Sequence, residues 1–340
     1  MTEYDLRISN TSFNEEDWSQ VTRIRTTSPR SSGQPESFRV GGLDPSSAYL
    51  LAIKAADEVP NWSGISNYAS TTTFDEAPPE LELVWGSHGS NENQFDAPMD
   101  VSVFQGLVYV ADWNNHRIQA FDENGQFRFT IGESQLSKSF HMSNDAQGSL
   151  FVADSGYVRI VVFDQAGQET NSWILSHSPS SIFVQGEELS VSMWNDVVRF
   201  TTAGAPLPGL VLRYPEQPQI TNLSSGTNDS WVVLFSDPQV SSYNGDQLVS
   251  SWGSSGTGLG FMNHPKDLAV DQDGNILVAD TGNQRIQKFS ATGRFLAAWG
   301  RPGPAPGEFA RPVAIALQEP NVVYVADSGN DRIQKFRWHH

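Results

Sequence analysis

The chain has 340 residues, no cysteine, and 21 Lys and Arg against 39 Asp and Glu, which gives a formal net charge of −18. The absence of cysteine excludes disulfides, cysteine-ligated zinc and a thiol nucleophile. The acidic balance argues against nucleic acid as a partner, because phosphates are bound by Lys and Arg. No apolar run reaches the ~20 residues that span a bilayer, so we expect no membrane insertion.

The first part of the chain, residues 1–73, is predicted to form a partial β-sandwich. Residues 4–9 and 49–53 alternate apolar and polar side chains, as half-buried strands do. The pattern Leu43-x-Pro45-x-x-x-Tyr49 matches a tyrosine corner, so this part resembles a fibronectin type III domain. It lacks that family's first two strands. We therefore expect that the given start is truncated and that an export signal has been lost with those strands.

Residues 74–79 are acidic, contain a Pro pair, and are predicted to be a stiff linker.

From residue 80 onward the chain is repetitive. The phrase Val-Ala-Asp, followed five residues after its Asp by Arg-Ile, occurs four times, at 110–121, 152–163, 278–289 and 325–336. A recurrence every 40–50 residues is typical of solenoids and propellers.

Each strong repeat contains four short strands, and a segment of constant length leads into it. This segment runs from Gly86 to Pro98 and from Gly300 to Pro312, with a third copy over 253–265. The pattern resembles the NHL repeat, which implies an all-β, six-bladed β-propeller of four-stranded blades over residues 80–340. Residues 80–86 are predicted to pair beside 332–338, so that an N-terminal strand closes the ring and removes an exposed edge.

The Asp and Arg of each repeated phrase are predicted to bind adjacent strands together, because a catalytic pair would be needed once rather than four times. The segment Asp271–Asn275 has the opening of a calcium loop but lacks the Glu at its twelfth position. We interpret it as a hairpin turn.

In a propeller, the loop after each second strand and the connection between blades lie on one face, here called the loop face. His264 is the strongest candidate there, because it precedes Pro265 where an innermost strand begins. No HExxH motif or helical His pair is present. No catalytic, cofactor or metal residue is therefore assigned, although zinc or calcium stays open. The candidate ligand-binding residues are His264, Trp113, His116, Tyr157, Trp194, Asp237 and His88.

The NHL resemblance implies three classes of function. The amidating lyases place zinc-binding His directly after the Pro of the connecting segment, where this chain has Met99, Lys266 and Val313. The RNA-binding class needs a basic face, which the charge argues against. We therefore predict a monomeric, non-enzymatic interaction module, extracellular or in a bacterial cell envelope, that binds protein, peptide or glycan through the loop face. The alternative is a metal-dependent lyase or hydrolase at the mouth of the central channel, built from His264 and its neighbours.

Overall fold

The computed structural model describes residues 3–24, 47–56, 62–66, 69–72, 76–133, 135–137, 139–193, 196–208, 212–213, 219–225, 230–245 and 247–338. The chain divides into two compact units, Met1–Ala77 and Pro78–His340. No helix of the described residues is long and apolar enough to cross a membrane.

The N-terminal unit contains one antiparallel sheet of order β2-β1-β3-β4. Its strands are β1 (Glu3–Ser9), β2 (Thr22–Ile24), β3 (Ala48–Ala56) and β4 (Ala69–Thr72). The short 3-10 helix η1 (Trp18–Gln20) contributes Trp18 to a small core with Phe13 and Ala52. Tyr49 is buried. The other residues of the expected tyrosine corner, Leu43 and Pro45, lie outside the described residues.

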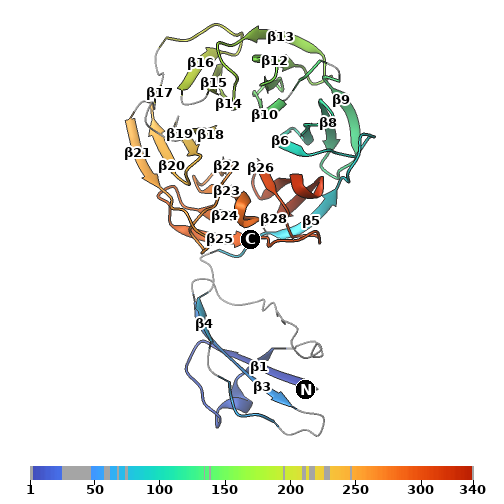
Figure 1. The fold of residues 1–340 in the computed structure, drawn as a ribbon. Helices are drawn as coiled ribbons and strands as arrows, with labels where there is room; N and C mark the ends of the chain where they lie inside the picture. The colour runs from blue at the N-terminus through green and yellow to red at the C-terminus, as the bar shows by residue number, and fades with distance from the viewer. Residues whose placement is uncertain are drawn as a thin grey trace. The chain divides into compact units, whose positions relative to one another are not determined.

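In the second unit, the described strands form six four-stranded antiparallel sheets, and Figure 1 shows them arranged around a common centre as a β-propeller. The first and second sheets hold β6 (Pro98–Phe104), β7 (Leu107–Asp112), β8 (Arg117–Asp122), β9 (Phe127–Ile131), and β10 (Ser139–Asn144), β11 (Leu150–Asp154), β12 (Arg159–Phe163), β13 (Glu169–Ile174). The third and fourth hold β14 (Ser181–Gln185), β15 (Glu188–Met193), β16 (Asp196–Thr201), β17 (Leu212–Arg213), and β18 (Ile220–Ser225), β19 (Ser230–Phe235), β20 (Val240–Asn244), β21 (Gln247–Trp252). The fifth holds β22 (Asp267–Val270), β23 (Ile276–Asp280), β24 (Arg285–Phe289) and β25 (Phe295–Trp299).

The sixth sheet combines both ends of the unit. It holds β26 (Pro312–Gln318), β27 (Val322–Asp327), β28 (Arg332–Arg337) and β5 (Glu80–Trp85). In the pairing of β28 with β5, Ile333 lies opposite Trp85 and Arg337 opposite Glu80. The prediction that residues 80–86 close the ring beside 332–338 is therefore confirmed.

The core lies between neighbouring sheets. Val108 and Val110 of β7 pack toward the sixth sheet, in a cluster that includes Trp85 and Tyr324. The alternate residue Tyr109 packs toward the second sheet. Because both faces of the second strands are covered, most of them, such as β7 and β27, are almost continuously apolar, whereas β15 alternates.

The repeated Asp and Arg form buried ion pairs, here called the brackets. Their Nε–Oδ2 distances are 2.9 Å for Asp112 and Arg117, 3.1 Å for Asp154 and Arg159, 2.7 Å for Asp280 and Arg285, and 2.9 Å for Asp327 and Arg332. Each pair joins the second and third strands of its sheet, which confirms the structural interpretation. All four Asp are fully buried.

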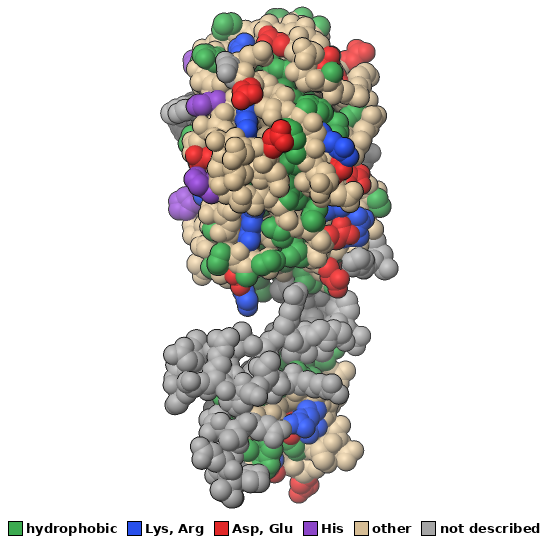
Figure 2. Space-filling view, turned by 90° about the vertical axis from the view of Figure 1, so that its right-hand side faces the viewer, with side chains coloured by type: hydrophobic (Ala, Val, Ile, Leu, Met, Phe, Trp, Pro, Cys, Tyr) green, Lys and Arg blue, Asp and Glu red, His purple; other side chains and the backbone are tan. Residues whose placement is uncertain are grey.

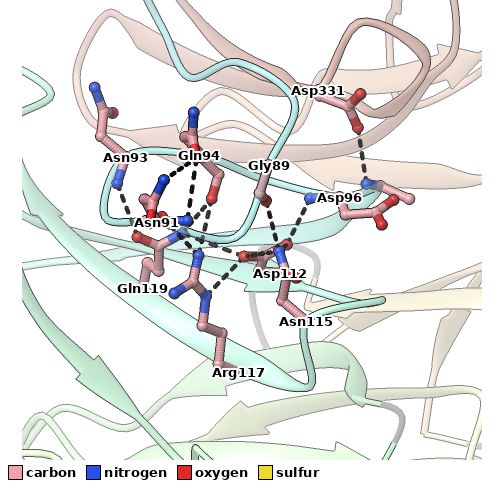
Figure 3. A network of polar contacts seen from close by, with 11 residues as sticks. Gly89, Asn91, Asn93, Gln94, Asp96, Asp112, Asn115, Arg117, Gln119 and Asp331 are labelled. Atoms are coloured by element: carbon pink, nitrogen blue, oxygen red, sulfur yellow. Dashed lines mark hydrogen bonds and ion pairs between the residues drawn. The ribbon is translucent and has the colours of Figure 1, made fainter.

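The brackets also hold the connecting loops (Figure 3). The amide of Asp96 donates to Oδ1 of Asp112 at 2.8 Å, and Arg117 donates to the carbonyls of Asn91 at 2.8 Å and Gln94 at 3.1 Å. The brackets therefore fix the loop face as well as the sheets.

The segment Asp271–Asn275 forms the expected turn. Oδ1 of Asp271 accepts the amides of Asp273 at 3.0 Å and Asn275 at 2.8 Å.

Candidate functional site

The candidate residues of the loop face are dispersed rather than gathered into one pocket. Tyr157 is 55% exposed, and the Arg159 guanidinium lies 5.3 Å from its ring centroid. His116 is exposed and hydrogen-bonds to the carbonyl of Ser137. Asp237 is exposed and Trp113 half-buried. Trp194 lies outside the described residues.

The remaining two candidates, His264 and His88, are both exposed. Nδ1 of His264 lies 2.7 Å from Oδ1 of Asn263. The His side chains in view in Figure 2 lie along one edge of the propeller unit. His264 does not line the cavity that lies among the innermost strands of the sheets.

His88 belongs to a group that the sequence did not reveal. Its Nδ1 lies 3.1 Å from Oδ2 of Asp331, and one ligand atom each from His88, Asp96 and Asp331 lie within 4.8 Å of one another. His88 and Asp96 belong to the 86–98 segment, whereas Asp331 comes from the distant loop between β27 and β28, so no linear motif could show the group. Asp331 also accepts a hydrogen bond from the Ala97 amide at 2.8 Å. Asp96 accepts one from the Asn114 side chain, also at 2.8 Å.

The three connecting segments of equal length share one backbone shape but differ, among other positions, at the residue before the buried Phe95, Met262 or Phe309. Each has the same parallel bridge, and in the segments 86–98 and 300–312 a polar side chain caps the turn. Gln94 Oε1 accepts the Asn91 amide at 3.1 Å, and Glu308 Oε2 accepts the Ala305 amide at 3.0 Å. In 253–265 the matching residue is Phe261, which cannot accept a hydrogen bond.

Phe261 is 48% exposed and its neighbour Leu259 is 50% exposed. The backbone below them is fixed, because the Phe261 carbonyl accepts from Arg285 and Gln287, each at 2.8 Å. The next residue, Met262, is fully buried. Two apolar side chains are thus presented to solvent by a rigid loop of the loop face.

A cavity of about 430 Å³ lies among the innermost strands of the six sheets. The strand registers place one residue of each sheet at an equivalent position, opposite the small or apolar residue that precedes the end of the second strand. We call this set the channel ring. Its members are Asp100, His141, Ser181, Asn222, Asp267 and Ala314.

The two Asp of the ring connect neighbouring sheets. Asp100 accepts the amides of Val101 at 2.8 Å and of Met142, in the next sheet, at 2.5 Å. Asp267 accepts the amides of Leu268 at 2.8 Å and of Ile315, again in the next sheet, at 2.6 Å. These carboxyl groups satisfy backbone donors along strand edges that face the channel.

Burial changes the charge states of the ring. It raises the pKa of Asp267 to about 7, and it raises the pKa of Asp100 well above its usual value, with a further contribution from the Asp267 charge. Burial and the nearby Lys266 ammonium lower the pKa of His141 to about 4. His141 is therefore neutral at pH 7, because a low dielectric disfavours the charged forms.

Asn222 is the unsatisfied member of the ring. It is 4% exposed, and its Oδ1 has no hydrogen-bond partner among the described residues. Its Nδ2 lies 3.4 Å from Nδ1 of His141 and also bonds to Asp267.

A weak signal for the ring exists in the sequence, since Asp100 and Asp267 each stand two residues after a Pro. The other sheets carry different residue types at that position.

Comparisons with known proteins support the repeat and the fold. The NHL repeat family matches residues 95–121 and 262–289. The chain is 50% identical over 50 residues to protein brain tumor of Drosophila melanogaster, covering 14% of this chain and 5% of that protein. It is 30% identical over 224 residues to the E3 ubiquitin-protein ligase TRIM71 of Rattus norvegicus, covering 64% of this chain and 21% of that protein. The chain thus spans only a small part of these relatives.

Solved structures with a similar fold include proteins of different functions. A gluconolactonase from Xanthomonas campestris has a TM-score of 0.57 at 13% identity, covering 78% of this chain and 96% of its own. A streptogramin B lyase has a TM-score of 0.52 at 13% identity, covering 76% of this chain and 88% of its own. The WD40 β-propeller domain of Doa1 has a TM-score of 0.54 at 11% identity, covering 78% of this chain and 98% of its own. At such identities the likeness shows the fold alone. The chain contains NHL repeats and folds as a β-propeller.

Proposed function

We propose that this chain is a six-bladed NHL propeller, joined to a fibronectin type III-like module, that acts as a non-enzymatic module binding a protein or peptide through its loop face. The observation that carries the proposal is the exposure of Phe261 and Leu259 where the equal-length segments have polar or Pro residues. The predicted extracellular or cell-envelope location belongs to the same proposal.

Exposed apolar side chains on a rigid backbone are suited to binding. Burying a Phe or Leu side chain is worth about 1.5–3 kcal/mol. Little ordering cost opposes this gain, because Arg285 and Gln287 already hold the Phe261 carbonyl. Asn263 and His264 lie beside the apolar pair and can supply part of a polar rim.

The net charge of −18 favours a basic partner. Opposite charges accelerate encounter and do so less at high salt. We therefore expect the association rate of the partner to fall as ionic strength rises.

The alternative of a metal-dependent lyase or hydrolase is favoured by one observation, the cavity that contains Asp100, His141 and Asp267. Both carboxyl groups, however, accept two backbone amides each, which is the arrangement of groups that hold strands together. This supports binding ahead of catalysis.

The test is a double variant, Phe261→Gln with Leu259→Glu, which gives this segment the residues found in 86–98. Partners from an extract of the native host are quantified on immobilised wild-type and variant chains. A matched control, Ile174→Ser, removes an apolar residue that is 79% exposed on an outer strand. We expect a basic partner to be lost with the double variant and kept with the control. Equal capture by the wild type and the double variant would refute the proposal.

A further inference from the structure

We propose that the channel ring binds a hard divalent cation, of the calcium or magnesium class, among Asp100, Asp267 and Asn222. The proposal does not depend on partner binding at the loop face, because it rests on residues of the innermost strands. It would add an ion site to the axis of the propeller.

The first observation is the set of polar groups at register-equivalent positions of the innermost strands. Five of the six register-equivalent positions carry a group that can donate a lone pair: two carboxyl groups, an imidazole, an amide and a hydroxyl. A carboxylate oxygen that accepts one backbone amide retains a further lone pair for a metal ion. The hydrogen bonds from Met142 and Ile315 therefore orient Asp100 and Asp267 without using up their ligand capacity.

The second observation is the unsatisfied amide oxygen of Asn222. The residue is 4% exposed and lines the cavity, and its Nδ2 is already engaged by His141 and Asp267. The amide is thereby oriented, with Oδ1 as the group lacking a partner. Leaving a buried acceptor unsatisfied is energetically unfavourable. A cation would satisfy this oxygen.

The third observation is the balance of charge around the cavity. Asp100 and Asp267 are 5% and 4% exposed, and neither has a salt bridge to a Lys or Arg among the described residues. Lys266 lies near His141, but its side chain is exposed to solvent. A bound water could satisfy Asn222, but unlike a water a cation would also interact favourably with the two buried carboxyl groups.

The chemistry of the ligands indicates the class of ion. Oxygen donors outnumber the one imidazole, and the chain has no cysteine. Carboxylate and amide oxygens suit Ca²⁺ and Mg²⁺, whereas softer ligands favour zinc or copper. The cavity of about 430 Å³ leaves room for the waters that complete the shell of such ions.

The decisive experiment is isothermal titration of the full chain, after treatment with a chelator, with calcium chloride and separately with magnesium chloride. We expect one saturable site for at least one of the two ions. Asn222→Ala should weaken binding at least tenfold, and Asp267→Asn should do so more strongly. The matched control is Asp331→Asn, which disables the His88 group and should leave the affinity unchanged.

A second measurement does not depend on how well the variants fold. Mn²⁺ added to the wild-type chain should broaden the amide NMR signals of Met142 and Ile315, which bond to the ring carboxylates, before those of Gly89 and Ala97 in the 86–98 segment. The proposal is overturned if neither ion binds saturably. It is also overturned if the broadening centres on Gly89 and Ala97, or if binding is lost in Asp331→Asn and retained in Asn222→Ala.

Discussion

The brackets and the channel ring both occupy equivalent positions in several sheets, yet they differ in how strictly the residue type recurs. The bracket is Asp with Arg in four sheets, whereas the ring holds five different residue types. A group repeated unchanged in four sheets serves what those sheets share, the joining of strands and loops. A position whose residue changes from sheet to sheet meets a need that is local.

The same contrast separates the equal-length connecting segments. Gln94 and Glu308 cap their own turns, whereas Phe261 cannot form such a cap and its ring is exposed to solvent. Such a departure lowers local stability without improving the core. It therefore points to a surface used for contact.

The largest effect is expected from breaking a bracket. Asp112→Ala should lower the free energy of unfolding by about 3–5 kcal/mol, because it leaves the buried Arg117 guanidinium without a counter-ion. Urea unfolding followed by fluorescence measures this. Asp273→Ala, at an exposed turn, is the control and should cost less than about 1 kcal/mol. Similar losses in both variants would mean that the bracket has no special role.

The ring should make stability depend on pH in a chelated sample. The folded pKa of Asp267 is about 7 and the usual value is 3.8, so the folded state holds its proton more tightly. Its contribution to the free energy of unfolding is fully present below pH 4. As pH rises through 7 this contribution is lost, by up to about 4 kcal/mol. Asp267→Asn should flatten this part of the pH profile of unfolding. An unchanged slope in the variant would contradict the assignment.

His141 should act in the opposite direction. Its folded pKa is about 4 against a usual value of 6.5, so its contribution is present above pH 6.5 and is lost as pH falls toward 4. The loss is up to about 3 kcal/mol. Unfolding of His141→Gln between pH 4 and 7 is the measurement, and the variant should be less sensitive to acid than the wild type. Equal acid sensitivity would show that the histidine titrates normally.

The smallest expected effect is a gain in stability. Phe261→Gln alone should stabilise the chain by about 0.5–1 kcal/mol, because a Gln can cap the 253–265 turn as Gln94 caps its own. Thermal unfolding of Phe261→Gln, which gains the cap, is compared with that of Gln94→Phe, which loses it. We expect the second change to destabilise by a similar amount.

The sequence was sufficient for features that repeat or lie close along the chain. The brackets were predictable because Asp and Arg stand five residues apart on paired strands, and ring closure because 80–86 resembles a fourth strand without a sheet. The channel ring was missed because its residue types differ, and only the two Asp share both a residue type and a Pro two positions before them. The group of His88 and Asp331 joins residues 243 positions apart, which no local pattern encodes.

The most direct test of the central claim is an exchange of whole segments. Replacing residues 253–265 by the sequence of 86–98 keeps the length, the bridge and the Gly positions that the turn requires, and it removes Phe261 and Leu259. We expect the hybrid to fold with unchanged cooperativity and to lose its partner in quantitative capture from the native host. Retention of that partner at wild-type affinity by the folded hybrid would contradict the account.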